Sequence, residues 1–350
     1  MIAIVAVACG PSVVSGNLDL RSRSDGMTVE NTRADELQGE SNIANVAPIH
    51  AIPGHTSRVW AMSHSLDGRY LASGSRDGTV MIWDLERGHT VRTITTPNRS
   101  VRSLAFSPDG ASLAVGDSNG IITLWNAQSG DELMSISAHN DVVRDLAFDS
   151  LGQYIGSSSY DKTAKLWKVE DGTLIYTLRG HTDTVNTIAF SPDGKTVATG
   201  SGSVFNPPAD YSIRLWDVES GQEITQFRPH TNNVRELTFS PDGRYIASAS
   251  DDRTVKIWDV EAQDVVQTLQ GHTNDVPGVT FAIDGETLIT ASYDRSVRLW
   301  QRTTGLEIGQ LPKHPSQVWV VSYSNNHGTV ATGSDDGIVR IWEIPEGLTQ

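Results

Sequence analysis

Seven tryptophans recur along the chain at nearly constant intervals, and this repeat constrains the fold more than any other feature. Successive members lie 42 residues apart, except for one interval of 49. They are Trp83, Trp125, Trp167, Trp216, Trp258, Trp300 and Trp342. A constant period of this size indicates one supersecondary unit stacked several times, because a single unit cannot bury its own apolar surface. The 350 residues therefore predict one repeat domain rather than two or three unrelated ones.

Each unit has the pattern of four short strands. Alternating, β-branched runs end in the tryptophan, as at residues 79–83 and 254–258. Ser-Pro-Asp-Gly turns at 107–110, 191–194 and 240–243 mark tight hairpins, since proline presets φ and glycine tolerates positive φ. Gly-His pairs occupy one fixed place in three of the units. The pattern predicts an all-β chain.

The Gly-His and Trp-Asp pairs, together with four strands per unit, resemble the WD-repeat β-propeller family. Trp-Asp itself occurs at 83–84, 216–217 and 258–259, and other residues follow the tryptophan in the remaining units. The resemblance covers residues 44–344 and implies a seven-bladed β-propeller of four-stranded antiparallel blades. The last unit lacks an outer strand. We expect residues 45–52 to supply it and to close the ring, which would cover an exposed sheet edge.

The first nine residues are apolar, but a membrane-spanning helix needs about 20. The segment resembles the end of a bacterial lipoprotein signal peptide, with small residues before Cys9, whose thiol would be lipidated. The alternative is an uncleaved apolar terminus on a cytoplasmic protein, so two locations stay open: membrane-anchored and extracytoplasmic, or cytoplasmic. The polar composition that follows predicts a flexible tether up to residue 43, before the propeller at 44–344 and a stub at 345–350.

Net charge and cysteine content exclude several classes of function. A net charge of −15 disfavours nucleic acid as a partner. A single cysteine excludes an internal disulfide and a zinc site built from several thiolates. The sequence contains no phosphate-binding loop and no HExxH motif. We expect a monomer that is not an enzyme and holds no metal or cofactor, with a membrane contact only through a lipid at Cys9.

Histidine, a hydroxyl residue and aspartate recur with the tryptophan in six of the seven units. A catalytic site occurs once, so this repetition indicates a scaffold. The resemblance implies a buried hydrogen-bonded chain in each set, from indole through hydroxyl and imidazole to carboxylate. The sets are His55, Ser73, Asp77, Trp83; His139, Ser157, Asp161, Trp167; His181, Thr199, Asp210, Trp216; His230, Ser248, Asp252, Trp258; His272, Thr290, Asp294, Trp300; and His314, Thr332, Asp336, Trp342.

The second unit keeps only the tryptophan of this set. Pro97, Val115 and Asn119 stand where the histidine, the hydroxyl residue and the aspartate would be. A partly satisfied polar network is worse than none, which explains why three members are missing together. We expect blade two to open before its neighbours.

The resemblance also implies a partner surface on the narrow top face of the ring, formed by two positions in each blade. The first set reads Trp60, Arg102, Arg144, Asn186, Arg235, Pro277 and Trp319, and the second reads Arg76, Ser118, Tyr160, Ala209, Asp251, Tyr293 and Asp335. Ring closure would make Trp60 and Trp319 neighbours. Aromatic residues and arginines often dominate interfaces, so we expect a protein or peptide partner with an apolar anchor and carboxylates.

Two alternatives to this partner site stay open. The two tryptophans could serve only to plug the mouth of the central channel, or the channel could hold a small ligand or an enzyme site. The 49-residue interval also places Phe205 in an insertion of blade four. It is either a further partner contact or part of a tolerated surface loop.

Overall fold

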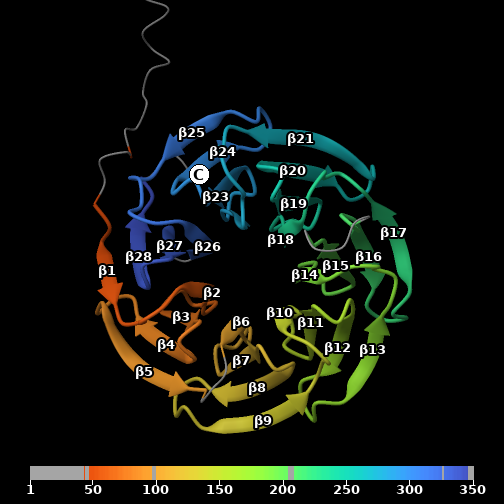
Figure 1. Ribbon diagram of the computed structural model, residues 1–350, viewed down its shortest axis with the longest axis horizontal. Coiled ribbons are helices and arrows are strands. Elements are labelled where there is room, and N and C mark those ends of the chain that lie inside the picture. Colours follow the sequence, from red (N-terminus) through yellow and green to blue (C-terminus); the bar gives the residue numbers. More distant parts are fainter. Residues whose placement is uncertain (1–42, 44–46, 97–99, 204–208, 325–326, 346–350) are drawn as a thin grey trace, which may run out of the picture. The chain divides into compact units, whose positions relative to one another are not determined.

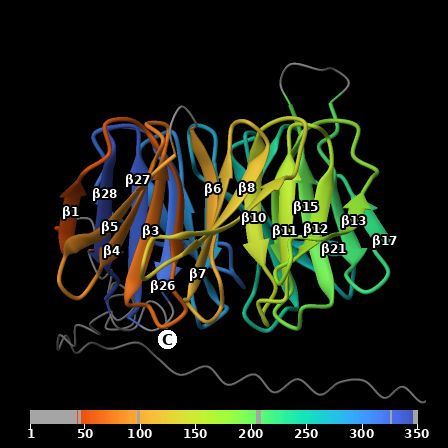
Figure 2. The same ribbon diagram turned by 90° about the horizontal axis from the view of Figure 1, so that it is seen from below.

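The computed structural model describes residues 43, 47–96, 100–203, 209–324 and 327–345. They form seven four-stranded antiparallel sheets, which stand as blades around a central axis (Figure 1). Figure 2 shows the ring from the side. The predicted seven-bladed β-propeller is confirmed. Cys9, Pro97 and Phe205 lie outside the described residues.

In blades one to six the four strands follow one another outward from the axis in chain order, and in blade seven the three inner strands do (Figure 1). The innermost strands are β2 (Val59–His64), β6 (Val101–Phe106), β10 (Val143–Phe148), β14 (Val185–Phe190), β18 (Val234–Phe239), β22 (Gly278–Phe281) and β26 (Val318–Ser324). The second strands are β3 (Tyr70–Ser75), β7 (Ser112–Asp117), β11 (Tyr154–Ser159), β15 (Thr196–Ser201), β19 (Tyr245–Ser250), β23 (Thr287–Ala291) and β27 (Thr329–Ser334).

The tryptophans of the repeat lie on the third strands of the blades. These are β4 (Thr79–Asp84), β8 (Ile121–Asn126), β12 (Ala164–Lys168), β16 (Ile213–Asp217), β20 (Thr254–Asp259), β24 (Val297–Gln301) and β28 (Ile338–Glu343). The outermost strands are β1 (His50–Pro53), β5 (His89–Thr95), β9 (Glu132–Ser137), β13 (Leu174–Leu178), β17 (Glu223–Phe227), β21 (Asp264–Gln270) and β25 (Glu307–Gln310).

Strand β1 closes the ring by joining blade seven, whose other three strands come from the opposite end of the chain (Figure 1). It pairs antiparallel with β28, with His50 opposite Ile341 and Pro53 opposite Ile338. The predicted closure is confirmed, but the strand covers 50–53 rather than 45–52. Pro48 has no N–H to donate to a ladder, which explains why the strand begins after it.

The core lies between neighbouring blades, where each sheet packs its apolar side chains against the next. At the junction of blades seven and one, the hydrophobic cluster includes Val59, Leu71, Trp83, Val339 and Ile341. Gly333 lies close to Val59 there, so that an added Cβ would come within 2.8 Å of its side chain. The structure also buries Ile43, at the end of the expected tether, in the cluster of blades six and seven.

The repeated histidine sets form hydrogen-bonded chains within the blades. In blade three the Trp167 indole donates to the Ser157 hydroxyl over 2.8 Å, and His139 bonds to Ser157 (2.8 Å) and to Asp161 (2.9 Å). Burial lowers the pKa of His139, which favours a neutral ring that donates to the aspartate and accepts from the serine. Blades four, five and six contain the same four-membered chain.

Blade one contains a variant of the chain. The Trp83 indole and His55 Nε2 each lie 2.8 Å from the Ser73 hydroxyl. On the other side of the imidazole, His55 Nδ1 lies 2.9 Å from the Thr79 hydroxyl and 3.5 Å from the Asp77 carboxylate. Thr79 in turn donates to Asp77 over 2.6 Å, so the hydroxyl links the imidazole to the carboxylate.

Blade seven departs from the expected chain at its last member. His314 and Trp342 both bond to Thr332 at 2.9 Å, but Asp336 accepts from Arg340 over 2.8 Å, and no bond to His314 is found among the described residues. In blade six the corresponding Arg298 lies 2.9 Å from Glu307 of the outer strand and 4.0 Å from Asp294, and Asp294 bonds to His272. Strand β1 contains no acid. Arg340 therefore pairs with Asp336, and the predicted hydrogen bond between His314 and Asp336 is wrong.

In blade two the lone tryptophan finds a substitute partner. The Trp125 indole donates to the hydroxyl of Thr123 on the same strand over 2.8 Å. Val115 is buried, Asn119 is exposed, and Trp125 is only partly buried, whereas the tryptophans of the other blades are at most 5% exposed. This blade is the least tightly packed around its tryptophan.

Candidate functional site

Six of the seven innermost strands carry a β-bulge at the same place, one residue after the strand begins. The residues skipped by the ladder are Trp60, Arg102, Arg144, Asn186, Arg235 and Trp319. A bulge leaves one residue unpaired and changes the direction of its side chain. In blade six Pro277 occupies the place, and β22 begins only at the next residue. These are the residues of the first expected set, at the face where the innermost strands begin, which we call the top face.

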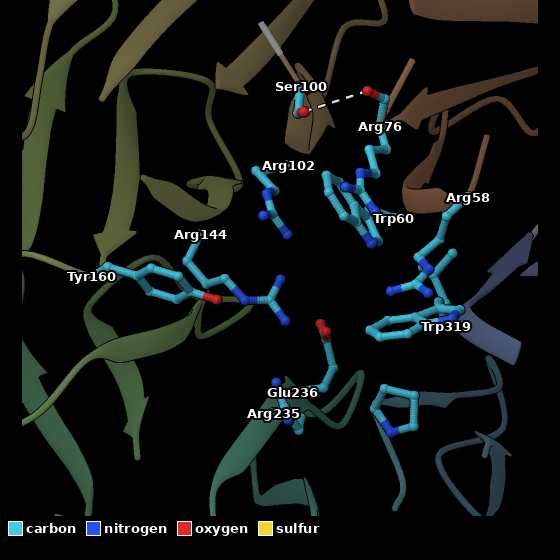
Figure 3. A pocket seen from close by; sticks show the side chains of 12 residues that line it. Arg58, Trp60, Arg76, Ser100, Arg102, Arg144, Tyr160, Arg235, Glu236 and Trp319 are labelled. Atoms are coloured by element: carbon cyan, nitrogen blue, oxygen red, sulfur yellow. Dashed lines mark hydrogen bonds between the residues drawn. The ribbon is translucent and has the colours of Figure 1, made fainter. Parts of the chain in front are cut away.

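Five of the bulged residues, together with Pro277, line one pocket at the top end of the channel (Figure 3). This mouth pocket has a volume of about 480 Å³. Its lining is Arg58, Trp60, Arg76, Ser100, Arg102, Arg144, Tyr160, Arg235, Glu236, Pro277, Trp319 and Val320. Tyr293 is not part of this lining but packs against Trp319, with ring centroids 4.3 Å apart. The ring therefore gathers eight expected partner residues from six blades: Trp60, Arg76, Arg102, Arg144, Tyr160, Arg235, Tyr293 and Trp319.

The other expected residues have different places. Asn186 is buried and donates its side-chain amide to the carbonyls of Gly202 (2.8 Å) and Val234 (3.1 Å), which is a framework contact. Asp251 and Asp335 do not line the mouth pocket but pair with arginines that do.

Each of the two tryptophans in the mouth pocket is covered by an arginine. The guanidinium of Arg102 lies 3.5 Å from the ring centroid of Trp60, and that of Arg58 lies 3.9 Å from that of Trp319. Such cation–π contacts hold both partners in place. Both indoles are partly buried and line the same pocket from blades one and seven (Figure 3).

The five arginines of the mouth pocket fall into two groups. Arg58 is paired with Asp335, and Arg235 forms two bonds to Asp251, at 2.7 and 2.6 Å. Arg76, Arg102 and Arg144 have no ion pair with any residue that the structure describes. We call these three the unpaired arginines.

The closeness of the unpaired arginines changes the pKa of one of them. Burial and the nearby Arg144 lower the pKa of Arg102 to about 10. Glu236 is the one carboxyl among the residues that line the pocket (Figure 3). Burial and the nearby Asp145 raise its pKa well above the usual value. The pocket therefore has an excess of positive charge inside a chain whose net charge is −15.

Arg58 and Glu236 were not predicted as site residues. Each is a sequence neighbour of a framework or bulge position: Arg58 precedes Val59, and Glu236 follows Arg235. Only the bulge brings two consecutive residues of β18 to the same pocket, and a strict two-residue alternation does not predict this. The signal available in the sequence was a charged residue next to a position that faces the channel.

Within the described ranges, no group of three or more His, Cys, Asp or Glu residues is arranged to hold a metal ion. None of the described residues forms a helix that is both long and apolar enough to span a membrane.

Sequence comparisons match the repeat along most of the chain. The profile described as "IFT122 first beta-propeller" matches residues 142–344. "WD domain, G-beta repeat" matches residues 46–84, and "Anaphase-promoting complex subunit 4 WD40 domain" matches 95–150.

Individual relatives match over shorter segments. Protein Mut11 of Chlamydomonas reinhardtii is 40% identical over 70 residues, which are 18% of this chain and 19% of that protein. WD repeat-containing protein AAC3 of Dictyostelium discoideum is 34% identical over 90 residues, 25% of this chain and 18% of its own. The target of rapamycin complex subunit wat1 of Schizosaccharomyces pombe is 41% identical over 44 residues, 13% and 14% of the two chains.

This chain thus spans less than a fifth of the length of each of these relatives. The match to the first-propeller profile covers more than half of this chain. From its seven four-stranded blades and this match, the chain belongs to the WD-repeat β-propeller family.

Proposed function

We propose that the protein is a non-enzymatic scaffold that binds a protein or peptide partner on the top face, at the mouth pocket. The observation that carries this proposal is the set of three unpaired arginines beside two partly buried tryptophans. The partner presents carboxylates to the arginines and an apolar side chain to the indoles. Relatives whose names describe complex subunits, such as the target of rapamycin complex subunit, support an interaction role.

The charge distribution favours such a partner at this one place. The net charge of −15 repels acidic segments from most of the surface. The mouth pocket attracts them, because Arg76, Arg102 and Arg144 have no acidic partner among the residues that the structure describes. Electrostatic complementarity of this kind sets specificity and association rate more than affinity.

Selection from a library of short displayed peptides tests the proposal. The full chain should enrich peptides that combine acidic residues with a large apolar residue, and an Arg102→Ala/Arg144→Ala double variant should not. The matched control is Arg179→Ala/Arg228→Ala, which removes two exposed arginines outside the pocket. Enrichment that is equal on all three proteins would refute a partner site in the mouth pocket.

A Trp60→Ala/Trp319→Ala variant separates binding from plugging. If the indoles contact the partner, the variant loses the selected peptides while its melting temperature stays close to that of the wild type. A large fall in melting temperature with peptide binding intact would mean that the tryptophans only close the channel.

A further inference from the structure

Four of the residues that line the mouth pocket each have an unpartnered hydrogen-bond donor. The indole nitrogens of Trp60 and Trp319 and the Nε atoms of Arg102 and Arg144 are buried and have no hydrogen-bond partner among the described residues. Buried polar groups in proteins are nearly always paired. Four orphaned donors around one cavity indicate that acceptors come from outside the chain.

The charges of the pocket are also uncompensated. Arg58 and Arg235 each pair with an aspartate, whereas the unpaired arginines have no such partner in the described part of the chain. Glu236 compensates them poorly, because its raised pKa disfavours the charged form. A ligand with a single carboxylate would leave most of this charge unbalanced.

We propose that the mouth pocket binds a phosphoryl dianion, held by Arg76, Arg102 and Arg144. A phosphate monoester has a charge of about −1.5 to −2 at neutral pH and three strong acceptor oxygens. The planar guanidinium group offers paired N–H donors that match those oxygens. The inference rests on the proposed use of the mouth pocket and specifies the chemical group that the unpaired arginines recognise.

The size of the pocket limits what can carry this group. A cavity of about 480 Å³ accommodates one phosphorylated group with its neighbouring atoms. A nucleic acid strand would also have to lie against the rest of a strongly acidic protein. The phosphoryl group therefore comes from a phosphorylated side chain of a partner or from a free phosphate ester, and the test separates these two sources.

The test is isothermal titration calorimetry on the full chain with three probes. These are a short alanine peptide with a central phosphoserine, the same peptide with glutamate in that place, and glycerol 3-phosphate. We expect the phosphoserine peptide to bind at least about tenfold more tightly than the glutamate peptide, because charge-assisted bonds to a dianion are stronger and more numerous. Glycerol 3-phosphate that binds as tightly as the phosphopeptide would identify a free ester as the source, and much weaker binding would identify a phosphorylated protein.

Variants of the unpaired arginines locate the binding. Arg102→Gln/Arg144→Gln should weaken the phosphopeptide at least about tenfold, whereas Arg102→Lys/Arg144→Lys should weaken it less, because lysine keeps the charge but not the paired donors. Arg179→Gln/Arg228→Gln, which removes two exposed charges elsewhere, should change nothing. Thermal melts of each variant show that it is folded.

Two results would overturn the inference. Equal affinity for the phosphoserine and glutamate peptides would reduce the site to a carboxylate site, and the proposed function would stand. Phosphopeptide binding that survives loss of both arginines would place the anion elsewhere. Conversely, phosphate binding without any selected acidic peptide would sink the proposed function and leave this inference intact.

Discussion

Removing strand β1 tests whether the ring owes its stability to closure by the N-terminal segment. One truncation deletes residues 2–40 and keeps both Ile43 and β1, and the other deletes residues 2–53. The longer deletion removes a four-residue pairing with β28 and the bond from the Ile49 amide to the Ile341 carbonyl, which measures 2.8 Å. It also removes Ile52, which packs against the cluster at the junction of blades seven and one, and the buried Ile43 of the cluster of blades six and seven.

The expected loss follows from these contacts. A backbone hydrogen bond contributes about 1 kcal/mol net, half-burying an isoleucine contributes about 1 kcal/mol, and fully burying one contributes about 2 kcal/mol. We expect the longer truncation to lose about 4–6 kcal/mol of unfolding free energy after allowing for the ordering of the strand. For a domain of about 300 residues that corresponds to a fall in melting temperature of roughly 6–10 °C.

Thermal melts followed by circular dichroism measure this difference, and size-exclusion chromatography adds a second readout. The truncated ring exposes the edge of β28, which should pair with other molecules and shift the elution volume. Point variants keep the chain length constant: Ile52→Asp should destabilise, whereas Ala51→Asp on the exposed face should not. Equal melting of the two truncations would refute closure as the source of stability.

Two further predictions concern the hydrogen-bonded chains. Burial and the nearby Arg340 lower the pKa of His314 to about 4; because the unfolded chain takes up its proton near pH 6.5, stability should fall as the pH drops from about 6.5 to 4. Thermal melts across this range should show that the melting temperature of His314→Gln depends less on pH than that of the wild type. The control His89→Gln, at an exposed histidine, should keep the pH dependence of the wild type. Identical pH dependence in His314→Gln and the wild type would exclude His314 as a contributor. Native-state hydrogen exchange should find the amides of β6–β8 less protected than those of the other blades, because Trp125 is the least buried of the seven repeat tryptophans, and protection equal to that of blade three would contradict this.

The repeat was predictable from the sequence because its tryptophans fill one equivalent place in every blade. The period of 42 residues predicts both the number of blades and the need for a strand from the other end of the chain. The limits of β1 were less accessible, since they depend on how Pro48 interrupts a ladder with β28. Short strands tolerate such shifts without a change of fold.

Contacts between distant residues explain what the repeat could not predict. Arg58 pairs with Asp335, which is 277 positions away, and this pair exists only because the ring closes. Asp336 pairs with Arg340 because the outer strand of blade seven has no acid in the place of Glu307, which pairs with the equivalent arginine of blade six. The position of a residue in the repeat predicts its place in the blade. The partner of a charged residue depends instead on which other charges the fold brings close.

The bulge in the innermost strands has a consequence for how this protein can change. Because the bulged residue makes no ladder bonds, its side chain can be exchanged without breaking the pairing of its blade. Five of the six bulged positions converge on one cavity, where they hold two tryptophans and three arginines, and the sixth holds the framework residue Asn186. The frame of paired strands thus permits the residues that line the mouth pocket to vary while the ladders of the blades stay intact.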